Sequence, residues 1–144
     1  MEKILKTKVY SAFPGCGKTT YFNTTNKNVL DSDSSKFDKK NFPKNYLEHI
    51  KHNVFKDDVD KILVSSHKEV RDALTTNQIP YVLVYPERDL KDEYIQRYKE
   101  RGNQLSFIEL LNNNWDIWMD EMDRQQGCYK VRLKSGQYLT DVID

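Results

Sequence analysis

The chain has few of the features that mark secreted, membrane-spanning or nucleic-acid-coating proteins. Its two cysteines, Cys16 and Cys128, are too few for a disulfide framework and lack metal-ligand spacing. The formal net charge is +1, from 23 basic and 22 acidic residues, which gives no strong nucleic-acid footprint. No apolar run approaches the ~20 residues that cross a bilayer, and the first residues lack the apolar segment of a signal peptide. We therefore expect a cytoplasmic protein with no membrane partner.

Aliphatic residues are also scarce. Only 38% of the 144 residues are hydrophobic, yet 12% are aromatic, with nine Tyr, six Phe and two Trp. A chain of this length fits one domain with one core, and no linker, repeat or low-complexity tract divides it. We expect a single domain over residues 1–144, with a core that aromatic rings complete.

One glycine-rich segment stands out, residues 12–20, which read AFPGCGKTT. A short apolar stretch precedes it and a helix is expected over 18–26, so it lies between strand and helix as a phosphate-binding loop does. Gly15 and Gly17 let the backbone curl so that successive N–H groups point at an anion. The positive end of the following helix also favours phosphate.

The side chains of this loop fit a nucleoside triphosphate and its Mg²⁺. Lys18 can reach the terminal phosphates as a point charge, while Thr19 offers a hydroxyl to Mg²⁺ and Thr20 a second oxygen near the α-phosphate. Ala12 stands where the usual pattern has its first glycine, a position that alanine tolerates at negative φ. The sequence thus predicts a nucleotide site built from Pro14, Gly15, Cys16, Gly17, Lys18, Thr19 and Thr20.

Strand and helix patterns alternate along the chain, which predicts an α/β fold with a largely parallel sheet. Strands are expected at 7–12, 29–30, 61–65 and 81–85, and helices at 18–26, 41–54 and 68–75. A long helical stretch follows over 90–124, broken near Gly102 and Asn103. The final segments, 129–133 and 138–143, look extended and are joined by a turn. The sequence leaves open whether this pair finishes the sheet or makes a contact in a homodimer.

Ligands of an open parallel sheet bind beyond the carboxyl ends of its strands, so the residues there are candidates for chemistry. Asp31 and Asp33 follow the second strand two residues apart, and therefore share one face of an extended segment. One carboxylate can hold the waters of Mg²⁺, and the other can orient the acceptor or take the proton of its hydroxyl. The same residues can instead cap their own turn.

The third strand and its continuation, ILVSSH, lack the acidic metal ligand of many nucleoside-triphosphate hydrolases. This absence disfavours a motor or switch-type hydrolase and shifts metal binding towards Asp31. Arg71, one turn into the next helix, can grip a substrate phosphate or lie exposed. Phe37, between the second and third strands, can cover a substrate ring or pack in the core.

Two arginines of the long helical stretch are candidates for transition-state stabilisation. Arg97 and Arg101 lie four residues apart and hence on one helix face. Phosphoryl transfer spreads negative charge over the transferring group, which positioned arginines stabilise. A helical lid over about 88–124 could carry them over the phosphates and exclude water. Alternatively, they pair with Glu93 or Glu100 in solvent.

The order of these motifs resembles that of the small P-loop kinases, which include nucleoside monophosphate kinases, shikimate kinases and gluconate kinases. The resemblance rests on AFPGCGKTT, DSDSS, SSHKEVRDAL and YIQRYKERGNQLSFIELLNNNW, and the chain is also similar to small phage-encoded proteins described as nucleotide kinases. The resemblance implies a three-layer P-loop NTPase-type fold with a five-stranded sheet, and ATP with Mg²⁺ as cofactors. It also implies metal binding by Asp31, acceptor contact by Asp33, and lid roles for Arg97 and Arg101.

We therefore expect an ATP-dependent kinase that transfers the γ-phosphoryl group to a small acceptor, foremost a nucleoside or deoxynucleoside monophosphate. The expected catalytic residues are Lys18, Asp33, Arg97 and Arg101, the substrate-binding residues Asp33, Arg71 and Phe37, and the Mg²⁺ ligands Thr19 and Asp31. Two alternatives stay open. One is a kinase for a sugar acid, a shikimate-like alcohol or a polynucleotide 5′ end, and the other is a nucleotide-binding regulatory protein with little turnover. If phage-encoded, the protein would act in the host cytoplasm.

Overall fold

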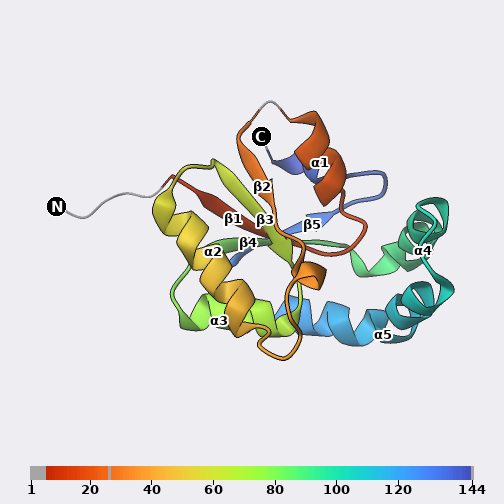
Figure 1. Cartoon of the computed structure of the whole chain (residues 1–144). Coiled ribbons are helices and arrows are strands. Elements are labelled where there is room, and N and C mark those ends of the chain that lie inside the picture. Colours follow the sequence, from red (N-terminus) through yellow and green to blue (C-terminus); the bar gives the residue numbers. More distant parts are fainter. Residues whose placement is uncertain (1–5, 26, 144) are drawn as a thin grey trace.

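A five-stranded, all-parallel sheet forms the centre of the molecule (Figure 1). The computed structural model describes residues 6–25 and 27–143. The strands are β1 (Lys8–Ala12), β2 (Val29–Asp31), β3 (Lys61–Ser65), β4 (Tyr81–Pro86) and β5 (Tyr129–Leu133), in the spatial order β2-β3-β1-β4-β5. The prediction of an α/β fold with a mostly parallel sheet is confirmed, and the observed sheet is parallel throughout.

Helices cover both faces of this sheet and give the molecule three layers. They are α1 (Lys18–Thr24), α2 (Lys44–Lys56), α3 (Lys68–Thr76), α4 (Lys91–Glu100), α5 (Leu105–Arg124) and α6 (Leu139–Val142), with 3₁₀ turns η1 (Ser34–Lys36) and η2 (Arg88–Leu90). α1 and α6 lie on one face and α2, α3 and α5 on the other (Figure 1). The right-handed crossover rule explains why α1 is separated from the others. The β1-to-β2 connection runs along the sheet in the opposite direction to the later crossovers, so its helix lies on the opposite face.

The same reversal marks the place where a ligand can enter. From the neighbouring strands β1 and β4 the chain leaves in opposite directions, towards β2 and β5. A crevice forms at such a switch point, beyond the carboxyl ends of the strands. The segment that follows β1 is the glycine-rich loop, which therefore lies where the topology opens the sheet to a ligand.

The core is formed by the central strands, α5 and several tyrosine rings. β3 and β4 are buried almost throughout, as expected for parallel strands that are covered on both faces. α5 adds a buried stripe at helical spacing, Ile108, Leu111, Trp115, Met119 and Met122. Tyr46, Tyr85, Tyr94 and Tyr98 are each less than 2% exposed. Aromatic rings thus complete the core as predicted, and α5, expected within a lid, packs into the body of the domain.

The C-terminal segment differs from the prediction. Residues 138–143 were expected to be extended, but Leu139–Val142 form the short helix α6. Tyr138 has extended backbone angles and caps this helix, and the Asp141 carboxylate accepts a hydrogen bond from the Tyr138 N–H. Leu139 is fully buried, and its N–H donates to the Cys16 carbonyl 2.8 Å away. A contact so distant in sequence replaces the extended pairing that local composition suggested.

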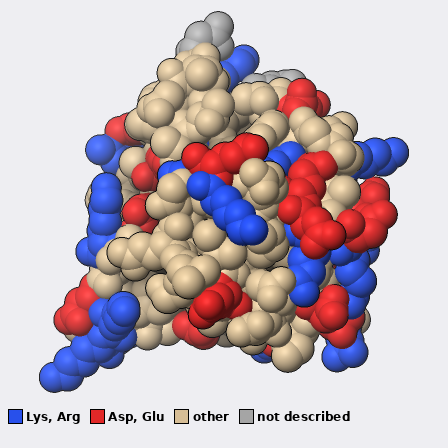
Figure 2. Space-filling view, turned by 90° about the vertical axis from the view of Figure 1, so that its right-hand side faces the viewer, with Lys and Arg blue, Asp and Glu red and all other residues tan. Residues whose placement is uncertain are grey.

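The face of the molecule that carries α4 has a mixed surface. Figure 2 shows Lys and Arg side chains interspersed with Asp and Glu side chains over this face, without a broad field of one sign. The positive and negative residues, nearly equal in number in the composition, are thus intermixed on this face. Within the described ranges, no helix has the length and apolarity that crossing a bilayer requires.

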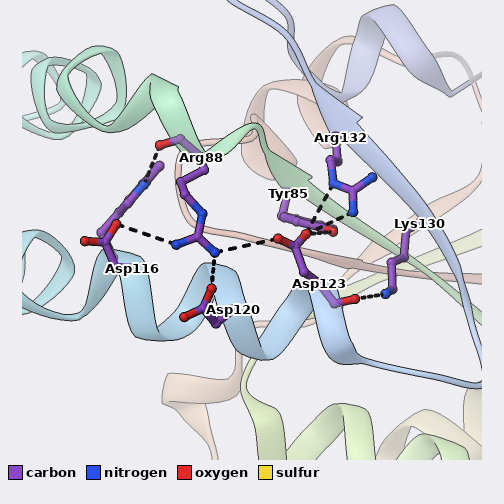
Figure 3. A network of polar contacts seen from close by, with 8 residues as sticks. Tyr85, Arg88, Asp116, Asp120, Asp123, Lys130 and Arg132 are labelled. Atoms are coloured by element: carbon purple, nitrogen blue, oxygen red, sulfur yellow. Dashed lines mark hydrogen bonds and ion pairs between the residues drawn. The ribbon is translucent and has the colours of Figure 1, made fainter.

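A polar network fastens α5 to the edge of the sheet (Figure 3). Asp123 of α5 accepts hydrogen bonds from the Tyr85 hydroxyl at 2.6 Å and from Arg132 of β5 at 3.0 Å. Arg88 of η2 pairs with Asp120 and, at 3.7 Å, with Asp123. Burial alone would raise the pKa of Asp123, but the bonds from Tyr85 and Arg132 outweigh it and lower this pKa below its ordinary value.

Substitution Asp123→Asn should lower the free energy of unfolding by about 1–2 kcal/mol at pH 7, because Tyr85 and Arg132 lose a charged acceptor. A carboxyl with a depressed folded-state pKa stabilises the fold above its unfolded pKa of about 3.9, and this contribution is lost as the pH falls further. Urea unfolding at pH 7 and pH 3 should therefore show a difference between variant and wild type that shrinks in acid. The control is Asp116→Asn, whose side chain is 76% exposed and lies 3.9 Å from Arg88. An equal loss in both variants would contradict the prediction.

Candidate functional site

The glycine-rich loop has a backbone that only glycine adopts easily. Gly15 and Gly17 have φ angles of 91° and 92°, in the region that disfavours side chains. Space is limited as well, because a Cβ on Gly15 would lie 3.0 Å from ring atoms of both Tyr94 and Tyr98. A Cβ on Gly17 would likewise lie 3.0 Å from the Tyr138 ring, so both glycines that the sequence predicted to shape the loop are required by conformation and by close packing.

The carbonyl groups of the loop are held from outside by other parts of the fold. Tyr98 Oη donates to the Pro14 carbonyl at 2.7 Å, Arg97 Nη1 to the Gly15 carbonyl at 2.8 Å, and the Leu139 N–H to the Cys16 carbonyl at 2.8 Å. In a trans peptide the C=O and the next N–H point in opposite directions. Fixing three successive carbonyls on one side therefore directs the following N–H groups to the other side.

Most of those N–H groups are available to a ligand. The amides of Gly15, Gly17, Lys18, Thr19 and Thr20 donate to no atom within residues 6–25 and 27–143, whereas the Cys16 N–H bonds the Phe13 carbonyl at 3.2 Å. Backbone donors in folded proteins normally have partners. Successive backbone amides without protein partners, next to a lysine, are the donors from which phosphate-binding loops are built.

Arg97 lies on the carbonyl side of the loop. Its guanidinium is stacked between the rings of Tyr94 at 4.3 Å and Tyr138 at 3.9 Å, and pairs with Glu93 at 3.0 Å. It also donates to the Gln137 carbonyl at 3.1 Å, and the residue is only 8% exposed. Of the two alternatives that the sequence left for Arg97, the structure shows the pairing with Glu93, although the side chain is buried and also holds the Gly15 carbonyl. The predicted contact with the transferring phosphoryl group stays a prediction.

Arg101 is placed differently. It is exposed, its guanidinium lies 5.4 Å from the centre of the Tyr98 ring, and its Nε donates to Asn103 Oδ1 at 2.9 Å. Its charge acts on Lys18, since Arg101 contributes to lowering the pKa of that amine. Of the two predicted lid arginines, Arg101 is the one with a charge that an incoming phosphate can reach.

Lys18 and the two predicted carboxylates interact electrostatically. Burial lowers the pKa of Lys18, while Asp31 and Asp33 act in the opposite direction. Burial raises the pKa of Asp31, and the Lys18 charge opposes that shift. Lys18 Nζ donates a hydrogen bond to the Ala12 carbonyl at 3.0 Å. The structure thus brings the predicted phosphate-binding lysine and both acids to one end of the sheet.

The two acids differ in their hydrogen bonds. Asp33 caps η1 by accepting from the N–H and hydroxyl of Ser35, at 2.9 and 2.7 Å, and these bonds lower its pKa. The turn-capping role that the sequence allowed for Asp33 is therefore present. Asp31 is half-buried at the end of β2, and its carboxylate has no hydrogen-bond partner in the described part of the chain.

A cavity of about 380 Å³ opens beside the loop. Lys18 and Phe13 line it at the loop, Ser65, His67 and Arg71 on the β3–α3 side, and Phe107, Trp118 and Glu121 along α5. Arg71 is 2% exposed and is fixed by bonds to the Ser66 carbonyl at 2.9 Å and to Gln125 at 2.7 Å. Its guanidinium forms part of the cavity wall, next to the predicted nucleotide site.

Phe37 is not among the residues that line this cavity. Its ring packs edge-on against Tyr46 at 4.9 Å and contacts His49 at 5.1 Å. The packing alternative that the sequence left open is therefore the observed one. The thiol of Cys16 is buried, and this burial raises its pKa to about 11, so it stays protonated. Cys16 therefore acts in the loop through its backbone.

Sequence reasoning missed the aromatic wall of the cavity. Phe107, Leu110, Trp118 and Glu121 lie at i, i+3, i+11 and i+14 of α5, which places them on one helix face. This face borders the buried stripe of α5, so the apolar periodicity of the helix does not distinguish Trp118 from a core residue. Glu121, a charged residue on the same face as Trp118, is the signal in the sequence that this face of α5 lines a cavity.

Comparison with known proteins gives no relative for this chain. No protein-family model matches it, and neither a curated protein nor a solved structure does. The functional argument therefore rests on the geometry of the loop and the cavity.

The packing of the loop predicts a difference between two glycines that both have positive φ. Gly15→Ala should destabilise the protein by about 1–3 kcal/mol more than Gly102→Ala, because both incur the left-handed strain but only the Gly15 Cβ meets buried rings. A Cβ on Gly102 would meet no atom of the described residues within 4 Å. Urea unfolding of the two variants measures the difference, and equal midpoints would show that the tyrosines do not confine the loop.

Proposed function

We propose that this protein is an ATP-dependent phosphotransferase that moves the γ-phosphoryl group to a small acceptor, a nucleoside or deoxynucleoside monophosphate. The observation that supports it is the division of the loop backbone into two sides. Its carbonyls are held by Tyr98, Arg97 and Leu139, and its free amides lie on the other side with Lys18. Such amides and a lysine bind the oxygens of a polyphosphate.

The arrangement of the strands supports a P-loop NTPase-type fold as the setting for this chemistry. The loop follows β1, the central strand of five, and precedes a helix. It lies at the switch point where open α/β sheets bind ligands. We propose that residues 14–20 hold the phosphates of ATP, with Lys18 at the terminal ones. Binding an anion there would also favour the charged form of Lys18, whose pKa is lowered by burial.

The residues present fit a Mg²⁺ ion. The Asp31 carboxylate has no hydrogen-bond partner in the described ranges, and Thr19 is exposed in the first turn of α1. Mg²⁺ prefers oxygen ligands and keeps several waters, so two side chains and the substrate phosphates suffice. A bound Mg²⁺ would neutralise phosphate charge during transfer. We propose that Thr19 binds this ion directly and that Asp31 holds its waters.

The remaining roles follow from position. Asp33 is exposed beside Asp31, and its lowered pKa keeps it ionised, so it can accept a hydrogen bond from the acceptor. Arg101 supplies a mobile positive charge near Lys18, suited to the charge that develops on the transferring group. Arg97 acts as a positioning residue through the loop backbone. The cavity next to Lys18 receives the acceptor.

One observation favours a second candidate, a nucleotide-binding regulatory protein with little turnover. Arg97 and Arg71, both expected to bind substrate phosphates, are instead buried and hydrogen-bonded to the protein. Fewer cations then face the phosphates than the kinase needs for rapid transfer. The two candidates share the same loop, and measurement of turnover separates them.

Substitution of Lys18 tests the phosphate site directly. Lys18→Ala should weaken binding of ATP·Mg²⁺ and lower turnover by roughly 10²–10³-fold, because the principal cation at the terminal phosphates is lost. Isothermal titration measures binding, and ADP release with a panel of monophosphates and sugar acids measures turnover. Lys56→Ala, at the C-terminal end of α2 and paired with Asp58 at 3.3 Å, is the matched control. A folded Lys18→Ala protein with unchanged binding and turnover would refute the proposal.

Arg97 of α4 and Arg101, the C-cap residue of that helix, should give opposite responses. Arg97→Ala should lower the free energy of unfolding by about 3 kcal/mol, since it leaves Glu93 and the carbonyls of Gly15 and Gln137 without their buried partner. Arg101→Ala should leave the melting temperature unchanged and lower kcat at least tenfold, since it removes charge stabilisation only. Thermal unfolding and steady-state kinetics separate these effects. Loss of kcat at unchanged stability in Arg97→Ala would instead place Arg97 at the transferring phosphoryl group.

A further inference from the structure

We propose that the cavity between the loop, α3 and α5 binds a guanine ring, with Glu121 and Arg71 reading its edge. This inference rests on the proposed function and narrows its acceptor to a guanine nucleotide. Glu121 and Lys18 line the same cavity of about 380 Å³, a volume in the range of small-molecule sites. An acceptor can therefore place its base at Glu121 and its phosphate near the loop.

The walls of the cavity suit a flat aromatic ring. Phe13 and Trp118 both line the cavity and contact each other edge to face, with ring centres 6.5 Å apart and ring planes at 69°, and Phe107 lines the same space. Phe13 is held in place by an edge contact with the buried Trp115 at 5.6 Å. Trp118 is only partly buried, so its ring is available to a ligand. Stacking on aromatic side chains is favourable for any base, and a sugar acid would lack this contribution.

The polar end of the cavity pairs a hydrogen-bond donor with an acceptor. Arg71 Nη2 lies 4.0 Å from Glu121 Oε2. Arg71 Nε donates to the Ser66 carbonyl and Nη1 to Gln125, which fix the guanidinium and leave the Nη2 hydrogens for other partners. Glu121 is about one-third exposed, and its carboxylate is the acceptor. A donor thus adjoins a carboxylate that can accept two hydrogen bonds.

Guanine is the base that complements this pair. Its Watson–Crick edge carries one acceptor, O6, followed by two adjacent donors, N1–H and the N2 amino group. O6 can accept from Arg71 while both donors reach the carboxylate of Glu121. Adenine and cytosine would turn a ring-nitrogen acceptor towards Glu121, and thymine offers a single donor between two carbonyls. Unpaired or opposed polar groups of this kind produce strong discrimination between similar ligands.

The test compares four deoxynucleoside monophosphates, dGMP, dAMP, dCMP and dTMP, with wild type and Glu121→Gln. Wild type should bind dGMP at least tenfold more tightly than the others in isothermal titration with a non-hydrolysable ATP analogue and Mg²⁺. Glu121→Gln should lose most of this preference while its affinity for the ATP analogue stays unchanged. Glu109→Gln, on an exposed face of the same helix, is the matched control and should behave as wild type.

Tryptophan fluorescence gives a second measurement that does not depend on turnover. A base stacked on Trp118 should quench emission of wild type on dGMP addition, and Trp118→Phe should lose this response although Trp115 remains. If Lys18→Ala leaves ATP binding intact, the proposed function fails. If ATP binds in a Lys18-dependent manner but dGMP shows no preference, or if Glu121→Gln keeps that preference, only the guanine inference is overturned. Absence of dGMP binding in every condition overturns it as well.

Discussion

The opposed directions of C=O and N–H in a peptide unit are the constraint on which this site depends. A loop cannot present its amides to an anion unless its carbonyls have partners elsewhere. Here three successive carbonyls, of Pro14, Gly15 and Cys16, receive donors from a tyrosine, an arginine and a backbone amide. The shape of the side that we propose for phosphate binding is thus set by groups that would not themselves contact a phosphate.

This requirement explains why distant segments converge behind the loop. Arg97 is buried, and a buried cation is tolerated only when paired and hydrogen-bonded. Glu93 pairs with it, and the same carboxylate accepts bonds from Ser135 and the Gly136 N–H in the turn after β5. α4 and the C-terminal turn are therefore connected to each other through the group that holds the loop. A change that weakens the packing of α4 or of the C-terminal turn should therefore alter the conformation of the loop before it alters the sheet.

The sequence predicted what depends on local pattern. The strand at 61–65, the break between α4 and α5, and the loop between β1 and α1 follow from apolar runs, glycine and spacing, and all are observed. The four-residue spacing of Arg97 and Arg101 predicted that they share one helix face. It did not predict which part of the protein that face contacts. Arg97 bonds Gly15 and Leu139 bonds Cys16 across most of the chain. Contacts at that separation leave no periodic signal, so the role of Arg97 and the helix at 139–142 were missed.

The cations around the crevice fall into a buried group and a more accessible group, and the two groups have different roles. Arg97 and Arg71 are both under 10% exposed and are fixed by carbonyl and carboxamide oxygens, so they shape walls. Within residues 6–25 and 27–143, Lys18 hydrogen-bonds a carbonyl of its own loop, and Arg101 hydrogen-bonds an asparagine and lies over the Tyr98 ring. Replacing those neutral acceptors by phosphate oxygens would gain charge-assisted hydrogen bonds without breaking an ion pair. A protein of nearly zero net charge can therefore build an anion site, because the free cations need not be many if the backbone already supplies the donors.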